Sequence, residues 1–227
     1  MKKQDVRALI EQVGIVPVIR ASSPQDARFA AEAVALGGIP IVEITMTVPG
    51  AVGLIAELVR TAPEILVGAG TVLDEAAARR CADAGAQFLV SPGFDASTVA
   101  TARELDLLII AGALTPTEVM TAWKSGADFV KVFPCGNLGG PNYIKALKGP
   151  LPQVPLVPTG GVNLETATDY IRAGAAALGV GGELVQKEAL KARNGELIRG
   201  FARQFVELVK EARNLGANDP DRAAQAC

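Results

Sequence analysis

The chain alternates short apolar runs with longer segments in which apolar and polar residues recur at helical spacing. A short apolar run bounded by glycine, proline or polar turn residues is typical of a buried strand, whereas apolar residues three or four positions apart are typical of an amphipathic helix. The runs predict strands at residues 14–19, 41–45, 65–67, 87–90, 107–110, 128–134, 156–158 and 176–180. The longer segments predict helices at residues 2–12, 24–35, 50–61, 74–84, 95–104, 116–124, 142–148, 164–173 and 195–212.

The order of these elements indicates one fold. An N-terminal helix is followed by eight units, each a strand and then a helix. Alternating strands and helices predict parallel strands, and eight units predict a closed (β/α)8 TIM barrel of the α/β class, here with an extra N-terminal helix. An open doubly wound sheet is the alternative, although no G-x-G-x-x-G motif opens it. We expect one barrel domain over residues 1–213 and a flexible, small and polar tail over residues 214–227.

Residues 128–134 (Asp-Phe-Val-Lys-Val-Phe-Pro) place a lysine in the middle of an apolar strand. Side chains alternate along a strand, so Phe129, Lys131 and Phe133 share one face. Burial disfavours the charged ammonium, and a neutral lysine amine attacks carbonyl carbons to form a Schiff base. The alternative is a lysine at a sheet end whose charge reaches water along its apolar stem. The strand by itself leaves both interpretations open.

A second charged residue, Glu43, lies inside the predicted strand 41–45. Even-numbered strands of a barrel share interior layers, so Glu43 on the second strand and Lys131 on the sixth are expected to meet in the centre. A buried charge is costly alone and tolerable when paired. The pair is either a self-satisfied ion pair or a catalytic pair, in which Lys131 attacks a ketone and Glu43 shuttles protons. Its place at the catalytic end of a barrel favours catalysis.

The composition narrows the chemistry. The 227 residues include no histidine, which excludes Ser-His triads and metal sites built on imidazole. The three cysteines lack the spacing of a zinc site and fit a reducing cytoplasm, and no tight carboxylate cluster predicts a magnesium site. We therefore expect neither a metal nor a cofactor. A formal net charge of −2 gives no basis for binding nucleic acid or an anionic membrane, and no segment has the length and apolarity of a membrane span.

Two glycine-rich segments follow the last predicted strands. Residues 159–161 (Thr-Gly-Gly) and 181–182 (Gly-Gly) lie where barrels often bind phosphate through backbone N–H groups. Arg20, at the end of the first predicted strand, is a candidate to bind the same anion. The alternative is that the glycines serve only tight turns and that Arg20 is a solvated residue.

Five motifs occur in the order in which they occur in one enzyme family. They are Glu43-Ile44-Thr45, Gly68-Ala69-Gly70-Thr71-Val72, Ser91-Pro92-Gly93, Val130-Lys131-Val132-Phe133-Pro134 and Pro158-Thr159-Gly160-Gly161-Val162. With these motifs the chain resembles the KDPG/KHG aldolases over roughly residues 10–210. The resemblance implies a class I aldolase that cleaves 2-keto-3-deoxy-6-phosphogluconate (KDPG) to pyruvate and glyceraldehyde 3-phosphate. Many members also cleave 4-hydroxy-2-oxoglutarate (KHG) to pyruvate and glyoxylate.

The resemblance also implies roles for individual residues. Lys131 matches the Schiff-base lysine of the family, and Glu43 matches its general acid/base. The positions that line the pyruvyl pocket are Thr71, Pro92, Phe133 and Thr159. The positions of the phosphate loops are Gly160, Gly161, Gly181 and Gly182. The family forms trimers, so a cytoplasmic homotrimer that acts on a small 2-keto acid is implied here.

Two positions depart from the family pattern. Thr47 stands where some members carry an arginine that binds the substrate carboxylate, so this role is expected to pass to hydroxyl and backbone N–H groups, helped by Arg20. Glu183 stands where a serine often helps to hold phosphate. A carboxylate about 5 Å from phosphate is repelled by roughly 3 kcal/mol per unit charge pair at an effective dielectric constant of ~20, whereas one that points outward at a helix start favours the helix dipole.

Two other functions stay open. A sugar-phosphate epimerase or isomerase on the same barrel would use Lys131 as an acid or base and form no imine. A non-catalytic barrel that binds an anionic metabolite would keep Lys131 charged and paired with Glu43. Cys135, just past the lysine strand, is either a reactive thiol or a small packing residue, and packing is favoured.

Overall fold

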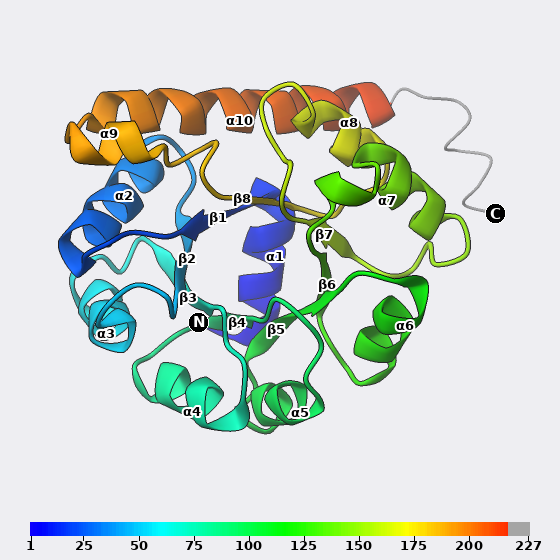
Figure 1. The fold of residues 1–227 in the computed structure, drawn as a ribbon, viewed down its shortest axis with the longest axis horizontal. Helices are drawn as coiled ribbons and strands as arrows, with labels where there is room; N and C mark the ends of the chain where they lie inside the picture. The colour runs from blue at the N-terminus through cyan, green and yellow to red at the C-terminus, as the bar shows by residue number, and fades with distance from the viewer. Residues whose placement is uncertain (218–227) are drawn as a thin grey trace.

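A computed structural model describes residues 1–217, which form a ring of strands surrounded by helices (Figure 1). The strands are β1 (Ile15–Ile19), β2 (Ile41–Thr45), β3 (Leu66–Gly70), β4 (Phe88–Val90), β5 (Leu108–Ala113), β6 (Phe129–Val132), β7 (Leu156–Pro158) and β8 (Leu178–Val180). The helices are α1 (Lys3–Val13), α2 (Pro24–Leu36), α3 (Ala51–Thr61), α4 (Glu75–Asp83), α5 (Ala96–Glu104), α6 (Pro116–Lys124), the 3-10 helix η1 (Gly136–Leu138), α7 (Pro141–Lys148), α8 (Ala167–Arg172), α9 (Lys187–Lys191) and α10 (Gly195–Ala217).

The hydrogen-bonded order of the strands follows the chain. Each strand from β1 to β7 pairs with the next one in parallel, and β8 pairs in parallel with β1. A parallel bridge between Thr159, just after β7, and Gly179 in β8 closes the ring. Eight parallel strands that alternate with helices form a (β/α)8 barrel. The predicted fold is confirmed.

The sequence signals for strands and helix starts have clear physical causes. Every strand residue is buried, because one face lines the barrel and the other packs against helices, and this is why the strands appear as continuous apolar runs. Several helices begin at side-chain caps: Ser23 accepts the N–H of Asp26 at the start of α2, and Asp74 accepts the N–H of Ala77 at the start of α4. Thr115 and Glu118 form a capping box at the start of α6.

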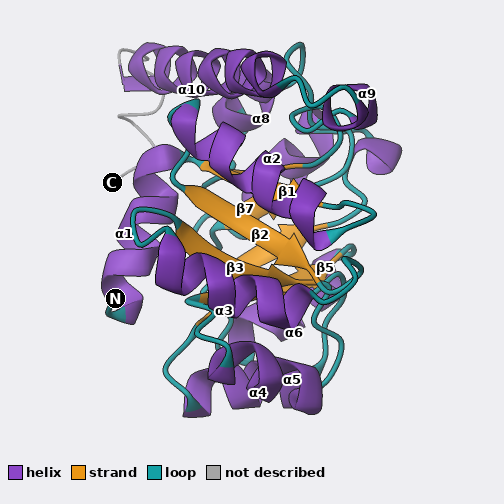
Figure 2. Cartoon of the chain, turned by 90° about the vertical axis from the view of Figure 1, so that its left-hand side faces the viewer, coloured by secondary structure: helices purple, strands orange, loops and turns teal. Residues whose placement is uncertain are grey.

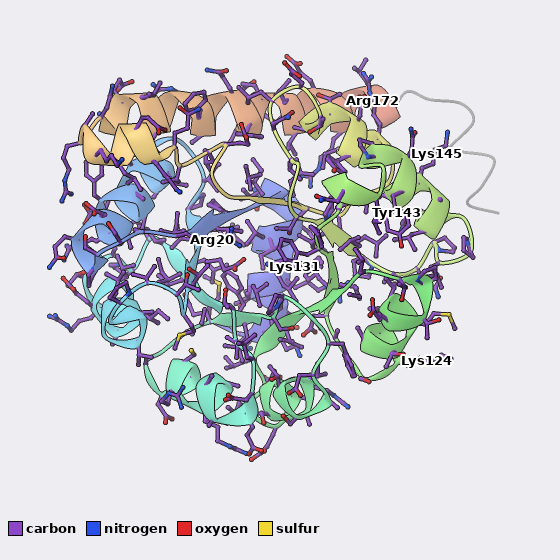
Figure 3. The ribbon with its side chains drawn as sticks, in the orientation of Figure 1. Arg20, Lys124, Lys131, Tyr143, Lys145 and Arg172 are labelled. Atoms are coloured by element: carbon purple, nitrogen blue, oxygen red, sulfur yellow. The ribbon has the colours of Figure 1, made fainter. Side chains whose placement is uncertain are left out.

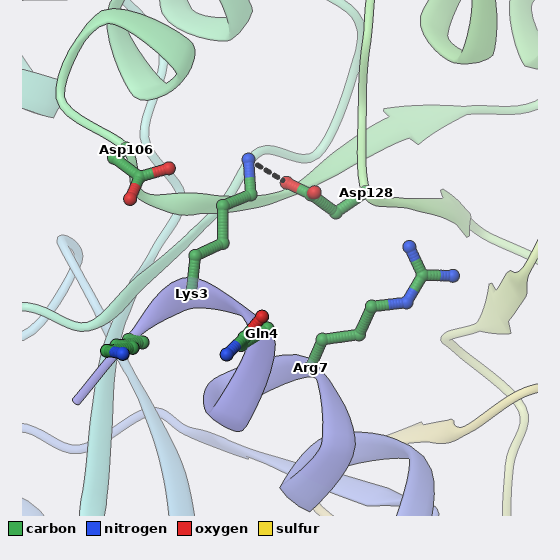
Figure 4. A pocket seen from close by; sticks show the side chains of 6 residues that line it. Lys3, Gln4, Arg7, Asp106 and Asp128 are labelled. Carbon is green, nitrogen blue, oxygen red and sulfur yellow. Dashed lines mark ion pairs between the residues drawn. The ribbon is translucent and has the colours of Figure 1, made fainter.

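Helix α1 covers the end of the barrel at which the strands begin (Figure 2). The ammonium of Lys3 pairs with the carboxylate of Asp128, just before β6, at 2.9 Å (Figure 4). The guanidinium of Arg7 lies over the ring of Phe129, 5.3 Å from its centroid. The predicted N-terminal helix therefore closes one end of the barrel, and a site at the barrel interior is reached from the other end.

Helix α10 packs across α2 and α8 (Figure 1). Its buried positions recur at helical spacing and are Ile198, Ala202, Phe205, Val209 and Ala212. The helix continues to Ala217, so it extends beyond its predicted end at residue 212 and includes the first four residues of the predicted tail. The rest of the predicted tail, residues 218–227, lies outside the described residues.

Arg213 on α10 holds together segments that are far apart in the chain. Its guanidinium donates to the main-chain oxygens of Gln12 at 2.7 Å, Glu11 at 2.8 Å and Ala176 at 3.3 Å. Replacing Arg213 with methionine, which keeps an apolar stem, is expected to lower the free energy of unfolding by about 2 kcal/mol, because hydrogen bonds from a charged donor contribute roughly 1.5–3 kcal/mol. Urea unfolding followed by circular dichroism measures this loss.

The matched control is Lys210→Met on the same helix. Lys210 forms an exposed ion pair with Glu207, and such pairs contribute little. A change below roughly 0.5 kcal/mol is expected for the control. Equal losses in the two variants would show that Arg213 contributes no more than a surface charge does.

The structure extends some of the predicted elements and adds two short ones. Strand β3 extends through Gly68 and Gly70, although glycine is depleted in strands. Both glycines face groups that leave no room for a side chain: a Cβ on Gly68 would lie 2.4 Å from the ring of Phe88, and one on Gly70 would lie 1.9 Å from Oε1 of Glu43. Helices η1 and α9 were not predicted, since elements of three and five residues are too short to show a periodic pattern.

Candidate active site

Lys131 and Glu43 face each other inside the barrel, and Figure 3 shows Lys131 within the ring of strands. They come from β6 and β2, on opposite sides of the ring, and 5% and 2% of their side-chain surfaces are exposed. The Nζ atom of Lys131 lies 3.9 Å from Oε1 of Glu43. A lysine this deeply buried does not carry its charge to bulk water, so the alternative of a snorkelling lysine does not describe the structure.

The carboxyl group of Glu43 is held in a tight space that Gly70 leaves free. Burial raises the pKa of Glu43, and the positive charges of Lys131 and Arg20 offset only part of the rise. Within residues 1–217, Oε1 of Glu43 has no hydrogen-bond partner. A carboxyl group with a raised pKa keeps its proton at a higher pH than an ordinary glutamate, so it can both accept and return a proton.

Apart from Glu43, the groups described next to Lys131 are small or apolar. Its Nζ atom lies 5.5 Å from the centroid of the Phe133 ring, and its neighbour in β5 is Gly112. The loop after β4 folds over Gly112, whose N–H donates to the hydroxyl of Ser91 at 3.2 Å. A Cβ on Gly112 would lie 2.2 Å from the carbonyl carbon of Pro92. Pro92 is therefore packed against the strand next to Lys131.

Thr71, the residue after β3, adopts a left-handed backbone conformation with φ 57°. This conformation is rare for a β-branched residue, and backbone strain of this kind concentrates at functional sites. Thr71 follows Gly70, the glycine that contacts Glu43. No sequence rule distinguishes this threonine from one in an ordinary turn.

A cavity of about 170 Å³ lies where β1, β6, β7 and β8 end. Seven of the predicted site residues line it: Arg20, Phe133, Thr159, Gly160, Gly161, Gly181 and Gly182. The other lining residues, not predicted as binding residues, are Val18, Val162, Gly179 and Glu183. Gly179 is needed because a Cβ there would lie 2.1 Å from the hydroxyl of Thr159. Phe133 connects this cavity to Lys131, since its ring is close to the ammonium.

Five predicted site residues do not line this cavity: the catalytic pair Lys131 and Glu43, and the binding positions Thr47, Thr71 and Pro92. Thr47 is exposed, and its hydroxyl lies 2.7 Å from that of Thr45, which bonds to the main-chain oxygen of Ile19 at 3.0 Å. Since Thr45 has one hydroxyl proton and donates it to Ile19, Thr47 is the donor in the bond between the two threonines. The proton of Thr47 is therefore already used.

Cys135 is fully buried beside the same loops. Its thiol lies 3.7 Å from the carbonyl oxygen of Gly140, and burial raises the pKa of the thiol to about 11. A thiol that keeps its proton at neutral pH is a poor nucleophile, which fits the packing role.

Other features of the described residues do not coincide with this site. A larger cavity of about 660 Å³ beside α1 contains none of the predicted site residues (Figure 4). Within residues 1–217, no three His, Cys, Asp or Glu side chains gather closely enough to bind a metal ion. None of the helices in this part of the chain combines the length and apolarity that crossing a membrane requires.

Comparison with known proteins gives consistent matches. Residues 6–200 match the family described as KDPG and KHG aldolase. The KHG/KDPG aldolase of Escherichia coli (strain K12) is 34% identical over 209 residues, which are 92% of this chain and 98% of that protein.

Two solved structures share both sequence and fold with the chain. KDPG aldolase from Legionella pneumophila, with pyruvate captured at low pH as a covalent carbinolamine intermediate, is 32% identical with a TM-score of 0.81 over 87% of this chain and 96% of that one. The 2-keto-3-deoxy-6-phosphogluconate aldolase of Zymomonas mobilis ZM4 with 3-phosphoglycerate is 27% identical with a TM-score of 0.81 over 90% of this chain and 96% of that one.

Proposed function

Because this chain belongs to the KDPG and KHG aldolase family, we propose that it cleaves KDPG to pyruvate and glyceraldehyde 3-phosphate, and KHG to pyruvate and glyoxylate, through a Schiff base on Lys131. The chain is then an aldehyde-lyase that needs no metal. The observation that carries the proposal is the buried Lys131, 3.9 Å from a carboxyl group at the centre of the barrel. The covalent carbinolamine of the Legionella relative supports the same chemistry here.

In the proposed reaction, the neutral amine of Lys131 attacks the C2 ketone of the substrate and forms a carbinolamine, which takes up a proton from solvent and loses water to give an iminium ion. Glu43, as a carboxylate, takes the proton of the C4 hydroxyl. The C3–C4 bond breaks, its electrons pass to the iminium nitrogen as an enamine, and the aldehyde leaves. Glu43 then returns the proton to C3, and water hydrolyses the resulting imine to release pyruvate and free Lys131. The raised pKa of Glu43 suits this exchange of a proton in both directions.

The surrounding residues have proposed binding roles. The pyruvyl part of the substrate would lie among Thr71, Pro92, Phe133 and Thr159. The part that leaves as the aldehyde, called the tail below, would lie at Gly160, Gly161, Gly181 and Gly182. Phe133 and Thr159 line the cavity, which supports their share in binding. The substrate carboxylate would be bound by Arg20, whose positive charge reaches Glu43. Thr47 contributes a weaker contact, since its hydroxyl proton is engaged by Thr45.

The two other functions considered for this barrel are not favoured. The matched family and the relatives of the chain are aldolases, rather than epimerases or proteins that only bind metabolites. We further propose that the protein works in the cytoplasm as a homotrimer, as its family resemblance implies. Light scattering coupled to size-exclusion chromatography tests the assembly: a mass near three times 23.4 kDa is expected, and a monomer would contradict it.

Trapping with borohydride tests the proposed function. The protein is incubated with pyruvate and sodium borohydride, its intact mass is measured, and the modified peptide is mapped. One reduced pyruvyl adduct on Lys131 is expected, with none when pyruvate or borohydride is omitted. A folded protein without an adduct would favour the epimerase or the binding barrel, and an adduct on another lysine would contradict the assignment of Lys131.

Replacing Gly70 with alanine is expected to lower kcat/KM for KDPG cleavage roughly a hundredfold, because displacing a catalytic group by about 1 Å has this cost. The added Cβ would lie 1.9 Å from Oε1 of Glu43, so the carboxyl group must move. The matched control is Gly53→Ala in α3, where nothing beyond the adjoining residues and the helix's own backbone lies within 4 Å of the new Cβ. Equal activities of the two variants would show that the position of Glu43 does not depend on Gly70.

A further inference from the structure

The cavity where β1, β6, β7 and β8 end contains two charged side chains, Arg20 and Glu183. They belong to segments that follow β1 and β8, which are neighbours in the ring. Both residues are exposed, and neither forms an ion pair with any of residues 1–217. The cavity therefore presents one positive and one negative group to a ligand, and every other lining residue is uncharged.

Arg20 is linked to the reacting centre by its charge. Burial raises the pKa of Glu43, and the positive charge of Arg20 offsets part of that rise, so Arg20 lies within electrostatic reach of the carboxyl group. The carboxylate of a 2-oxo acid is bonded to the carbon that joins Lys131, and it must lie close to this centre. Thr47 has no free hydroxyl proton for that carboxylate. Arg20 is thus the charged group of this cavity that can bind the carboxylate end of the substrate.

The tail of the substrate then meets Glu183 beside the glycine loops. A phosphate carries a charge of about −1.5 to −2 at neutral pH, and a nearby carboxylate repels it. A hydroxyl group can instead donate a hydrogen bond to the carboxylate while it accepts one from a backbone N–H group. The charges of the cavity therefore match a substrate with one carboxylate and an uncharged, hydroxylated tail better than one with two anionic ends.

We propose that Glu183 determines the tail specificity of this aldolase: it lowers the preference for a phosphorylated tail and makes unphosphorylated, hydroxylated 4-hydroxy-2-oxo acids substrates as well. This inference depends on the proposed aldolase function. It concerns how efficiently the same catalytic pair cleaves substrates with a phosphorylated tail and substrates with an unphosphorylated tail.

The test compares KDPG with its unphosphorylated counterpart, 2-keto-3-deoxygluconate, as substrates of the wild-type protein and of Glu183→Gln. The amide keeps the shape of the side chain and removes its charge. The ratio of kcat/KM for the phosphorylated substrate to that for the unphosphorylated one is expected to rise about fivefold in Glu183→Gln, mainly through a lower KM for KDPG, because exposed charges interact by up to about 1 kcal/mol, which is a factor of about five. The difference between the two proteins should shrink as salt is added.

The matched control is Glu188→Gln, a change of the same charge on the neighbouring helix α9, where the residue is exposed and does not line the cavity. Its ratio should stay within twofold of wild type. A ratio in Glu183→Gln that is unchanged, lower, or independent of salt would overturn the assignment. Borohydride trapping of pyruvate on each variant separates the two proposals: an adduct with an unchanged ratio rejects only the role of Glu183, whereas no adduct rejects the aldolase itself.

Discussion

Replacing Lys131 with arginine is expected to lower kcat/KM for KDPG cleavage by at least about 10⁴-fold, the order of loss seen when a catalytic nucleophile is removed. A guanidinium stays protonated at every accessible pH, so it offers no neutral amine to the ketone. Arginine nevertheless keeps a cation beside the buried carboxyl group of Glu43. Pyruvate release, coupled to lactate dehydrogenase and NADH, measures the rate, and the borohydride adduct should disappear as well.

Two further variants make this result decisive. Lys131→Met keeps most of the apolar stem and should be equally inactive, which guards against a defect that comes only from the bulk of arginine. Lys145→Arg, an exposed position on α7, is the matched control and should stay within twofold of wild type. If folded Lys131→Arg or Lys131→Met kept a tenth of the wild-type activity, a Schiff base on this lysine would be ruled out as the main route.

Replacing Glu43 with glutamine is expected to lower kcat by about 10³-fold, within the range for loss of a general acid/base. The amide has nearly the shape of the carboxyl group but neither takes nor returns a proton. Lys131 is still present, so the pyruvyl adduct should form, more slowly, to the same final yield. Steady-state cleavage and the time course of trapping measure these two effects separately. A variant that failed to form any adduct would assign Glu43 a role in holding Lys131 rather than in moving protons.

The pH dependence of the same variant tests the physical cause. Burial raises the pKa of Glu43 above the ordinary value of 4.5, so this group gains its proton at a higher pH than an exposed glutamate. As the pH falls through the raised pKa, the carboxylate needed to take the C4 hydroxyl proton is lost, so kcat should decline on the acidic side at a pH above 4.5. Glu43→Gln should lack this acidic decline of kcat, whereas Glu188→Gln should retain it. A decline that persists in Glu43→Gln is caused by the titration of another group.

The central pair of the site could be predicted from the sequence because strands follow simple rules. Side chains alternate along a strand, and even-numbered strands of a barrel share interior layers. These two rules predicted that Lys131 and Glu43 meet in the centre of the barrel. The structure adds their separation and shows how Gly70 confines the carboxyl group. A separation of this kind depends on strand tilt and on the side chains packed around the pair, which no local pattern encodes.

The loops were harder to predict for a related reason. Gly68 and Gly70 look like a turn in the sequence, and only the rings and carboxyl groups on other strands explain why they are strand residues. The bond between Thr47 and Thr45 depends on the path of the chain after β2, so the sequence suggested a free hydroxyl where the structure has an engaged one. Arg20 and Glu183 are separated by most of the chain, and they share a cavity because the ring closes.

The ring of strands is held by fewer hydrogen bonds between β7 and β8 than between its other neighbouring strands. The strands β7 and β8 stand at the two ends of the continuous hydrogen-bonded order, and they are joined by the Thr159–Gly179 bridge and by a bond of 2.9 Å from the N–H of Ala176 to the oxygen of Leu156. Pro158, the last residue of β7, has no N–H to add to this seam. Local opening costs least where few hydrogen bonds must break, so backbone amides at the seam should exchange with deuterated water faster than those of β2 and β6. The wall beside the substrate tail is then compliant and can adjust to tails of different size, while β2 and β6, which carry Glu43 and Lys131, stay rigid around the reacting carbon.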